Sequence, residues 1–421
     1  MKRYESYKPS GISWIGEIPS HWEVIRMKRI FSESEEKTVS EGGCLLSLSQ
    51  YTGITPKIEG QKKGMFEAES TIGYNIVHKG QFVMNIMLAW NGSYALSEYD
   101  GIISPAYSVF NFKLECVKKY FHYLLRLQSY AGAFKTQSRG IIDSRLRLYP
   151  NYFYQFPCLV PPLEEQKKIV EYLSTKTSLI DAQQSAREKE IRLLEELKQA
   201  EIANVVTRGL NPDVPMKKAQ TLLGEEIPFS WQLVRNRNIL REENILVGNR
   251  TDLPLLSLTK SGIILRDIAS GKGKFPKDFE KYKEVIPGNI VFCLFDIDET
   301  PRTVGLSSYS GMITGAYDVF SINNDIIDSR FLYHYFIAVD NIKALRPYYT
   351  GLRKVVQIAS FLGIQIPIPP LEEQRAIVEY IEQKNKAIDD MIANLRAEID
   401  FLTEYKQRLI ADAVTGQIKI D

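Results

Sequence analysis

The stretch that decides the fold is Pro161-Pro162-Leu163-Glu164-Glu165-Gln166, because it recurs 208 residues later as Pro369-Pro370-Leu371-Glu372-Glu373-Gln374. Each copy continues into Ile-Val-Glu-Tyr, at 169–172 and 377–380, and then into a long charged run. Proline suits the first turn of a helix, where its missing N–H group would have no partner. The paired glutamates that follow lie where the positive end of the helix dipole favours carboxylates. Each block therefore predicts the start of a long helix.

The segments before the two blocks also match. Glu17-Ile18-Pro19 with Trp22 corresponds to Glu226-Ile227-Pro228 with Trp231, and Leu-Leu-Ser-Leu stands at both 45–48 and 255–258. Gly101-Ile102-Ile103 corresponds to Gly311-Met312-Ile313. A period of about 210 residues indicates a duplicated domain, since solenoid repeats are several times shorter.

The duplication predicts four segments. Two similar α+β domains are expected over residues 1–160 and 209–368, and two long helical segments over 161–208 and 369–421. Within the domains we expect strands near 80–87, 107–112, 289–295 and 317–322, and helices near 118–133 and 328–344. Neither Leu163–Arg208 nor Leu371–Thr415 contains proline or glycine, and Gly209 and Gly416 supply stop signals.

The two predicted helices carry apolar stripes that favour a coiled coil. The stripe of the second helix has a seven-residue repeat, and that of the first is less regular. Antiparallel pairing of the two would relate the globular domains by a pseudo-twofold axis, a symmetry that suits two half-sites on duplex DNA. A helix hairpin inside a larger bundle is the alternative. The stripe residues are Ile381, Ile388, Leu395, Leu402 and Leu409 with Ile392 and Ile399, and Leu173, Ile180, Ile191, Leu194, Leu197 and Val205.

Composition is that of an ordinary globular protein, with 421 residues, 44% hydrophobic and 25% charged. No run is apolar enough for a membrane span or a signal peptide, so we expect a cytoplasmic protein. The four cysteines are dispersed, which predicts reduced core residues. The net charge is only +2, but the globular segments are net positive and the helical segments net negative. A phosphate-binding surface would therefore lie on the globular domains.

Signatures of catalysis are missing from the sequence. Gly271-Lys272-Gly273-Lys274 lacks the earlier glycine and the following Ser or Thr of a phosphate-binding loop. There is no G-x-S-x-G, no H-E-x-x-H and no Asn-Pro-Pro-aromatic motif. The histidines are isolated, and no metal site is expected. The pattern predicts a protein that binds and does not catalyse.

The duplicated Pro-Pro-Leu-x-Glu-Gln block that opens a long helix resembles the DNA-specificity subunit of Type I restriction–modification systems. Two further segments resemble the same family, namely Trp14-Ile15-Gly16-Glu17-Ile18-Pro19 with Trp22, and 101–107. The second copy departs from the pattern, with Thr314-Gly315 in place of Ser104-Pro105. The resemblance covers essentially the whole chain.

The resemblance implies a non-catalytic subunit in which each globular domain reads one half of a split DNA target. The helices would set the spacer between the halves and dock two modification subunits, which methylate adenine with S-adenosylmethionine. Restriction subunits, which use ATP and Mg, would join through the modification subunits. This chain would itself bind no cofactor. Two alternatives remain open, namely a coiled-coil scaffold or adaptor protein and an enzyme with a degenerate site.

Candidate DNA-binding residues follow from chemistry, because Arg and Lys bond to guanine or phosphate and Asn or Gln to adenine. Ordinary solvated loop charges are the alternative for each. In the first domain the candidates are Gln50, Tyr51, Lys57, Lys62, Lys63, Asn91, Lys135, Arg139 and Arg145. In the second they are Lys260, Arg266, Lys272, Lys274, Arg302, Arg346, Arg353 and Lys354. Gly140, Gly271 and Gly273 would let backbone approach phosphate.

Candidate partner-binding residues lie near the helix starts, namely Leu163, Ile169, Leu371 and Ile377. With the free faces of the helices, they could dock the modification subunits. Packing against the chain's own globular domains is the equal alternative.

Overall fold

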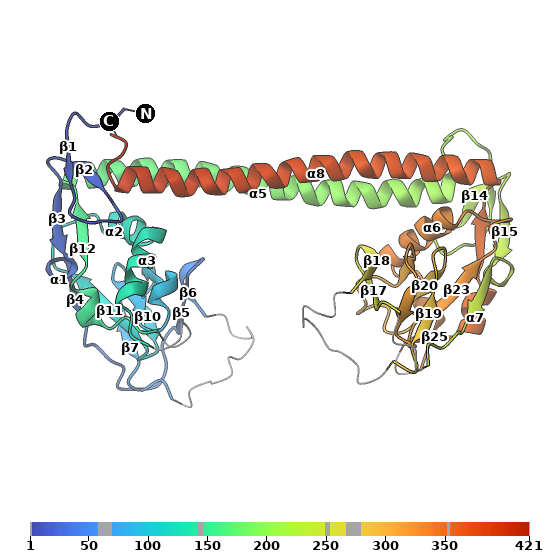
Figure 1. The fold of residues 1–421 in the computed structure, drawn as a ribbon, viewed down its shortest axis with the longest axis horizontal. Coiled ribbons are helices and arrows are strands. Elements are labelled where there is room, and N and C mark those ends of the chain that lie inside the picture. Colours follow the sequence, from blue (N-terminus) through green and yellow to red (C-terminus); the bar gives the residue numbers. More distant parts are fainter. Residues whose placement is uncertain are drawn as a thin grey trace. The chain divides into compact units, whose positions relative to one another are not determined.

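A computed structural model describes residues 2–57, 70–140, 146–248, 253–266, 279–351 and 354–420. The chain divides into two compact units: unit 1 comprises Met1–Arg187 with Ala397–Asp421, and unit 2 comprises Glu188–Arg396. Two long helices, α5 (Leu163–Arg208) and α8 (Leu371–Val414), each contribute to both units (Figure 1). The predicted starts of both helices and the end of α5 at Arg208 are confirmed, and α8 ends at Val414, one residue before the predicted Thr415.

Unit 1 is built from small antiparallel sheets. The largest has four strands in the order β4 (Phe31–Glu33), β11 (Tyr107–Phe112), β8 (Phe82–Asn85) and β9 (Tyr94–Leu96). The two-stranded sheets are β1 (Tyr7–Pro9) with β2 (Glu17–Pro19), β3 (Glu23–Arg26) with β12 (Pro157–Val160), β5 (Leu46–Ser49) with β6 (Gly53–Pro56), and β7 (Asn75–Val77) with β10 (Gly101–Ile103). The short helices are α1 (Met27–Ile30), η1 (Ala89–Asn91), α2 (Lys118–Leu125), α3 (Gln128–Gln137) and α4 (Pro150–Phe153).

Unit 2 repeats this scheme strand by strand, which confirms the duplication. Its four-stranded sheet has the order β16 (Leu240–Glu243), β23 (Asp318–Ile322), β20 (Ile290–Phe292) and β21 (Val304–Leu306). The pairs are β13 (Met216–Lys218) with β14 (Glu226–Pro228), β15 (Gln232–Arg235) with β26 (Gln365–Ile368), β17 (Leu256–Thr259) with β18 (Gly262–Leu265), and β19 (Lys283–Val285) with β22 (Gly311–Ile313). Unit 2 adds β24 (Tyr349–Thr350) with β25 (Val355–Val356), and its helices are η3 (Asn236–Asn238), α6 (Ser329–Asn341), η4 (Arg346–Tyr348) and α7 (Ile358–Gly363).

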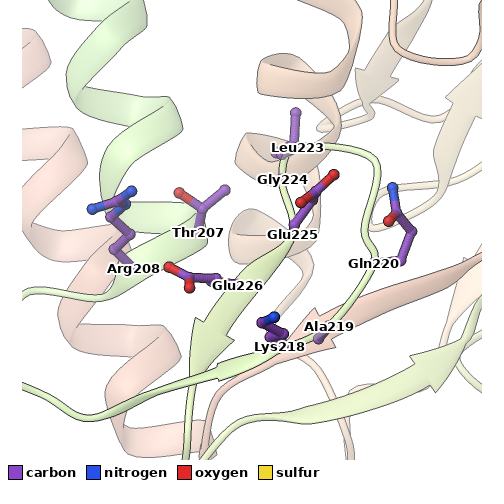
Figure 2. A pocket seen from close by; sticks show the side chains of 9 residues that line it. All are labelled: Thr207, Arg208, Lys218, Ala219, Gln220, Leu223, Gly224, Glu225 and Glu226. Atoms are coloured by element: carbon purple, nitrogen blue, oxygen red, sulfur yellow. The ribbon is translucent and has the colours of Figure 1, made fainter.

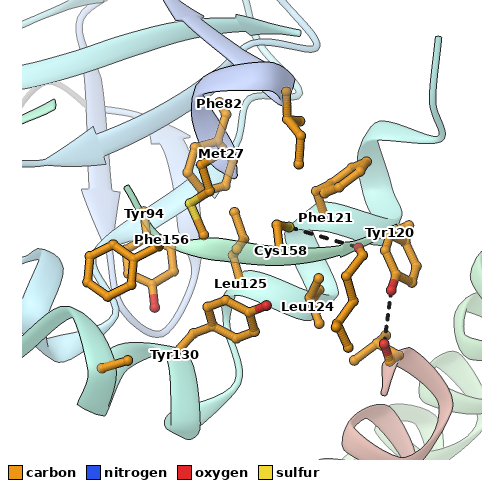
Figure 3. Close-up of a cluster of buried hydrophobic side chains, with 14 of the residues drawn as sticks. Met27, Phe82, Tyr94, Tyr120, Phe121, Leu124, Leu125, Tyr130, Phe156 and Cys158 are labelled. Carbon is orange, nitrogen blue, oxygen red and sulfur yellow. Dashed lines mark hydrogen bonds between the residues drawn. The ribbon is translucent and has the colours of Figure 1, made fainter. Parts of the chain in front are cut away.

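The core of unit 1 is rich in aromatic side chains and extends onto the long helices (Figure 3). Phe82, Tyr94 and Tyr130 are fully buried. Tyr120, on α2, donates a hydrogen bond of 2.9 Å from its hydroxyl to the carbonyl oxygen of Val414, near the end of α8. The end of α8 is therefore part of the core of unit 1.

The repeated glycines Gly101 and Gly311 mark a close backbone approach. A Cβ atom on Gly101 would lie 2.4 Å from the carbonyl oxygen of Cys44, and one on Gly311 would lie 2.5 Å from that of Pro254. The next residue in each strand donates its N–H group to the same oxygen, at 2.8 Å from Ile102 and 2.9 Å from Met312. Only glycine leaves room for this contact, which explains why both copies keep it.

Within each unit, α5 and α8 pair in antiparallel fashion. In unit 1, Gln184 donates a 2.7 Å hydrogen bond to Thr403, and Arg187 forms an ion pair with Glu398. In unit 2, Lys198 lies 2.7 Å from Asp389. These contacts confirm the predicted antiparallel pairing of the two helices. Gly209 and Gly416, at φ values of +76° and +72°, end the helices as expected.

Seven of the thirteen predicted stripe residues are buried, among them Leu173, Ile381 and Leu409 at most 2% exposed, and these three belong to the cores of the two units. Five others are half-buried, namely Ile191, Leu194, Leu395, Ile399 and Leu402. Leu197 is an exception, because 47% of its surface remains exposed, and its assignment to the stripe was wrong. The less regular spacing of the first helix carried too little information to place this residue on the buried face.

Two further expectations are corrected by the structure. The single helix expected near 118–133 is broken into α2 and α3, because Leu127 between them has an extended backbone with ψ of 141°. The cysteines are free, as expected, but Cys44 is exposed and Cys116 is half-buried, so only Cys158 and Cys293 are core residues.

Candidate nucleic-acid interface

The glutamine of the repeated block fastens each long helix to a globular domain. Gln166 is 2% exposed. Its side-chain oxygen accepts a hydrogen bond of 2.9 Å from the Val117 N–H group, and its amide group donates one of 2.9 Å to the carbonyl oxygen of Pro161. Gln374 is fully buried and makes the matching bonds, accepting 2.7 Å from Asp328 N–H and donating 2.8 Å to the Pro369 carbonyl. The block is thus an anchor for the helix start, which accounts for its recurrence.

The second glutamate of each block accepts a hydrogen bond from a buried tryptophan. The indole N–H of Trp22 lies 3.0 Å from Glu165 Oε2, and that of Trp231 lies 3.1 Å from Glu373 Oε2. Both indoles are fully buried, and a buried N–H without an acceptor is costly. The Glu-Ile-Pro-x-x-Trp and Pro-Pro-Leu-Glu-Glu-Gln motifs therefore recur together because they contact each other.

In unit 1 the anchor carries two additional partners. Tyr4 donates 2.8 Å to Glu165 Oε2, and His21 Nε2 lies 2.5 Å from Oε1. Burial by itself raises the pKa of Glu165, but the hydrogen bonds from Trp22, His21 and Tyr4 outweigh it and bring the pKa below its ordinary value of 4.5.

The lowered pKa of Glu165 predicts an acid-sensitive anchor. The stabilisation is fully present above the ordinary value of 4.5 and is lost as the pH falls through the lower folded-state pKa. We expect Glu165→Gln to lower the unfolding temperature of unit 1 near neutral pH, and the difference from wild type to shrink as the pH falls below 4.5. Thermal unfolding across this range measures it. Glu164→Gln, which changes an exposed carboxylate in the same helical turn, is the control. If the difference in unfolding temperature between Glu165→Gln and wild type grew toward acid pH, the stabilising role of the Glu165 carboxylate would be contradicted.

The candidates of the first domain lie at the turn between β5 and β6, directly after β6, in η1, in α3 and just after α3. Tyr51 is 84% exposed at the turn, beside half-buried Gln50, and Lys57 is exposed after β6. Asn91 is half-buried in η1. Lys135 lies over the ring of Trp90 at 5.4 Å, and Arg139 over that of Tyr152 at 5.0 Å. Lys62, Lys63 and Arg145 lie outside the described residues.

Arg126 is a residue that sequence reasoning missed. Its guanidinium donates to the carbonyl oxygens of Gln50 and of Tyr94, at 3.0 Å for the latter, and so fixes the β5–β6 turn. Burial lowers the pKa of Arg126, and the only sequence signal was one arginine in the middle of the helix predicted near 118–133.

The candidates of the second domain occupy corresponding places. Lys260 is exposed at the turn between β17 and β18, and Arg266 is half-buried directly after β18. Arg346 and Lys354 are exposed near β24 and β25. Lys272, Lys274 and Arg353, with Gly271 and Gly273, lie outside the described residues.

Arg302 differs from the other candidates, because its guanidinium is held inside the domain. Its Nη1 donates 2.9 Å to Asp340 Oδ2 and 3.0 Å to Asn341 Oδ1. The side chains of Arg302 and Asp340 are only 17% and 2% exposed. The described contacts therefore give Arg302 a structural role.

The candidate partner-binding residues divide into two kinds. Ile169 and Ile377 are 1% and 0% exposed and belong to the cores of units 1 and 2. Packing against the chain's own domains therefore accounts for both, and their assignment to a docking surface is corrected. Leu163 and Leu371 are half-buried, and a docking role for them stays a prediction.

A cavity of about 560 Å³ lies in unit 2, between the end of α5 and the β13–β14 hairpin (Figure 2). Arg208 and Lys218 line it together with Glu225 and Glu226. Because the two cations are balanced by two carboxylates, this cavity has no charge that would favour nucleic acid.

Over the described ranges, no three His, Cys, Asp or Glu side chains converge on a position suited to a metal ion. Among the same residues, none of the helices combines the length and the apolar character that crossing a membrane requires.

The model of the Type I restriction modification DNA specificity domain matches residues 19–193 and 274–400. The chain belongs to this family, whose members include the DNA-specificity subunits of Type I restriction–modification systems.

Two curated relatives come from Methanocaldococcus jannaschii. The Type I restriction enzyme MjaVIII specificity subunit is 26% identical over 371 residues, which is 80% of this chain and 79% of that protein. The putative type I restriction enzyme MjaX specificity subunit is 27% identical over 72% of this chain and 68% of its own length.

Solved structures share the fold. A chain from a type I R-M system, solved in a study of complex assembly and conformational transition, has a TM-score of 0.67 at 17% identity and covers 95% of this chain and 99% of its own. The HsdS subunit from Thermoanaerobacter tengcongensis has a TM-score of 0.53 at 18% identity, over 95% of this chain and 98% of its own. The predicted fold class, two α+β domains with two long helices, is confirmed.

Proposed function

We propose that this chain gives a Type I restriction–modification complex its DNA sequence specificity, with each globular unit reading one half of a split duplex target. The observation that carries the proposal is the strand-by-strand duplication of a domain with basic loops, anchored to a shared pair of antiparallel helices. Two similar units that differ in their loops suit two related but different half-sites.

The paired helices would fix the spacer between the half-sites and dock two modification subunits. Restriction subunits would join the complex through these. The chain itself would be non-catalytic and bind no cofactor, since S-adenosylmethionine, ATP and Mg would act in the partner subunits. Such a complex would work on DNA in the cytoplasm. Family membership argues against the adaptor alternative, which does not require DNA at all.

The test is to co-express the chain with its modification subunit and map methylated adenines across the host DNA. We expect a split motif with a fixed spacer that disappears when the chain is omitted. Binding of that duplex by the complex should weaken steeply with salt, because phosphate contacts release counterions. Methylation that does not depend on this chain would contradict the proposal.

A further inference from the structure

One carboxylate in unit 2 holds together a group of exposed cationic side chains. Asp298 lies in the loop after β20. Its Oδ1 accepts hydrogen bonds of 2.6 Å from Nε of Arg346 and 3.2 Å from the hydroxyl group of Tyr349. Its Oδ2 accepts a hydrogen bond of 3.3 Å from Nζ of Lys354. The three donors come from the segment that contains η4, β24 and β25, so Asp298 fixes this segment against the loop.

The two cations remain largely exposed in spite of these bonds. The side chains of Arg346 and Lys354 are 60% and 51% exposed. An arginine whose Nε is held by a carboxylate keeps the edge with its two Nη groups, which can donate in parallel to a pair of acceptors. Guanine presents such a pair, O6 and N7, in the major groove.

The loop that carries Asp298 is itself fastened to a buried carboxylate. Asp340, 2% exposed, accepts 2.6 Å from the hydroxyl of Thr303, 2.8 Å from Nζ of Lys343 and 2.9 Å from Arg302. Lys343 also donates 2.9 Å to the carbonyl oxygen of Thr300. The position of Asp298 is therefore determined by contacts in the interior of the domain.

Backbone strain is concentrated in this network. Among the described residues, three non-glycine residues have positive φ, namely Asp296 at 44°, Lys343 at 51° and Lys354 at 48°. Asp296 lies in the same loop as Asp298, Lys354 donates a hydrogen bond to Asp298, and Lys343 donates one to Asp340. Such conformations are costly and persist where the surrounding structure enforces them, typically at binding sites.

Unit 1 lacks this arrangement in its sequence. The corresponding loop, between Ile86 and Ser93, contains no Asp or Glu. The carboxylate and its cations therefore distinguish the second unit from the first, as expected of a feature that reads one half-site only.

We propose that Asp298 is a positioning residue for DNA recognition by unit 2, holding Arg346 to donate both Nη groups to a guanine edge and Lys354 to contact the neighbouring phosphate. This inference rests on the proposed function. It adds that the base contacted is guanine and that Asp298 orients the arginine that contacts it.

The experiment compares Asp298→Ala and Arg346→Ala with the wild-type chain, each co-expressed with the modification subunit. Methylated motifs are mapped, and binding to the wild-type duplex and to duplexes with single base-pair changes is measured. We expect both variants to lose about ten- to a hundredfold of the discrimination at one G·C pair in one half-site. The other half-site and the spacer should be unchanged, which a loss of folding alone would not produce.

Glu243→Ala is the matched control, because it removes the same charge from β16 of the same unit, where Glu243 accepts a hydrogen bond from Ser321. It should keep the motif. Arg346→Lys keeps the charge but not the paired donors, and should lose discrimination as Arg346→Ala does. If Asp298→Ala fails to fold, Arg346→Ala still tests the reading of guanine at an exposed side chain, and Asp298→Asn, which keeps the shape, tests the positioning role.

An unchanged motif in Asp298→Ala and Arg346→Ala, with a split motif in the wild type, would overturn the inference and leave the proposed function standing. An equal loss of affinity for every duplex would also overturn it, because it would assign Arg346 to phosphate. If the wild-type chain directs no split motif, the proposed function itself fails.

Discussion

Replacing residues 27–156 with the corresponding segment of another specificity subunit is expected to change one half of the methylated motif completely and to leave the other half and the spacer unchanged. The reason is that the candidate DNA-binding loops of unit 1 lie within this segment, whereas the contact of Trp22 with Glu165 lies outside it. The bond of Gln166 is to the backbone N–H of Val117, which any replacing segment also supplies unless it has proline there.

The junctions follow from the sheet that β3 forms with β12. These strands run side by side, with Arg26 opposite Pro157 and Glu23 opposite Val160, so the exchanged segment begins and ends at one place. Keeping β1, β2 and β3 also preserves their contacts with the end of α8, such as the 3.0 Å hydrogen bond from Tyr7 to the Gly416 carbonyl.

The matched control is the reciprocal exchange in unit 2. Residues 236–364 lie between β15 and β26, which pair in the same register with Arg235 opposite Gln365. This exchange should alter the other half of the motif. Sequencing of methylated adenines in both chimaeras gives the answer, and a single exchange that altered both halves would rule out independent reading.

Gln374→Leu is expected to destabilise unit 2 by about 3–5 kcal/mol, because it leaves the Asp328 N–H and the Pro369 carbonyl without partners in a buried site. The bond of 3.2 Å from the Gln374 amide to the Ile326 carbonyl is lost as well. Gln166→Leu should have a similar but smaller effect on unit 1. Thermal unfolding measures the loss, and hydrogen exchange at the starts of α6 and α8 assigns it to unit 2.

Glu372→Ala is the control for this substitution, since its exposed side chain lies in the same helical turn. It should cost less than about 1 kcal/mol, the usual contribution of a carboxylate at a helix start. A Gln374→Leu protein with wild-type stability and exchange would show that the buried amide does not secure the helix.

Much of the fold could be predicted from the sequence because its signals are local. The absence of proline and glycine from Leu163 to Arg208 gave the helix its limits, and the repeat of the first domain predicted β23 within 317–322. The break at Leu127 was missed, and the adjacent Arg126 donates hydrogen bonds to the carbonyl oxygens of Gln50 and Tyr94, which are distant in sequence. A tertiary contact of this kind leaves no local pattern.

The candidate site was less accessible to prediction. Residue type identified Arg302, Arg346 and Lys354 alike as cations in loops, but it could not separate an arginine bonded to buried Asp340 from one that reaches solvent. Asp298 was missed altogether, since nothing in its neighbourhood along the chain indicates that three donors from 346–354 converge on it.

The composition of the units has a consequence for biosynthesis. Unit 2 is one continuous stretch, Glu188–Arg396, but unit 1 requires Ala397–Asp421 in addition to Met1–Arg187. At about 5–20 residues per second, the ribosome needs at least about ten seconds after Arg187 to finish residues 188–421, which include this part. Until then Ile169 and Leu173 lack the cover that Leu409 and Val414 provide in the finished core. The domain that is translated first is thus the last to be completed, and a chain interrupted before residue 397 presents an apolar surface that chaperones and proteases can recognise.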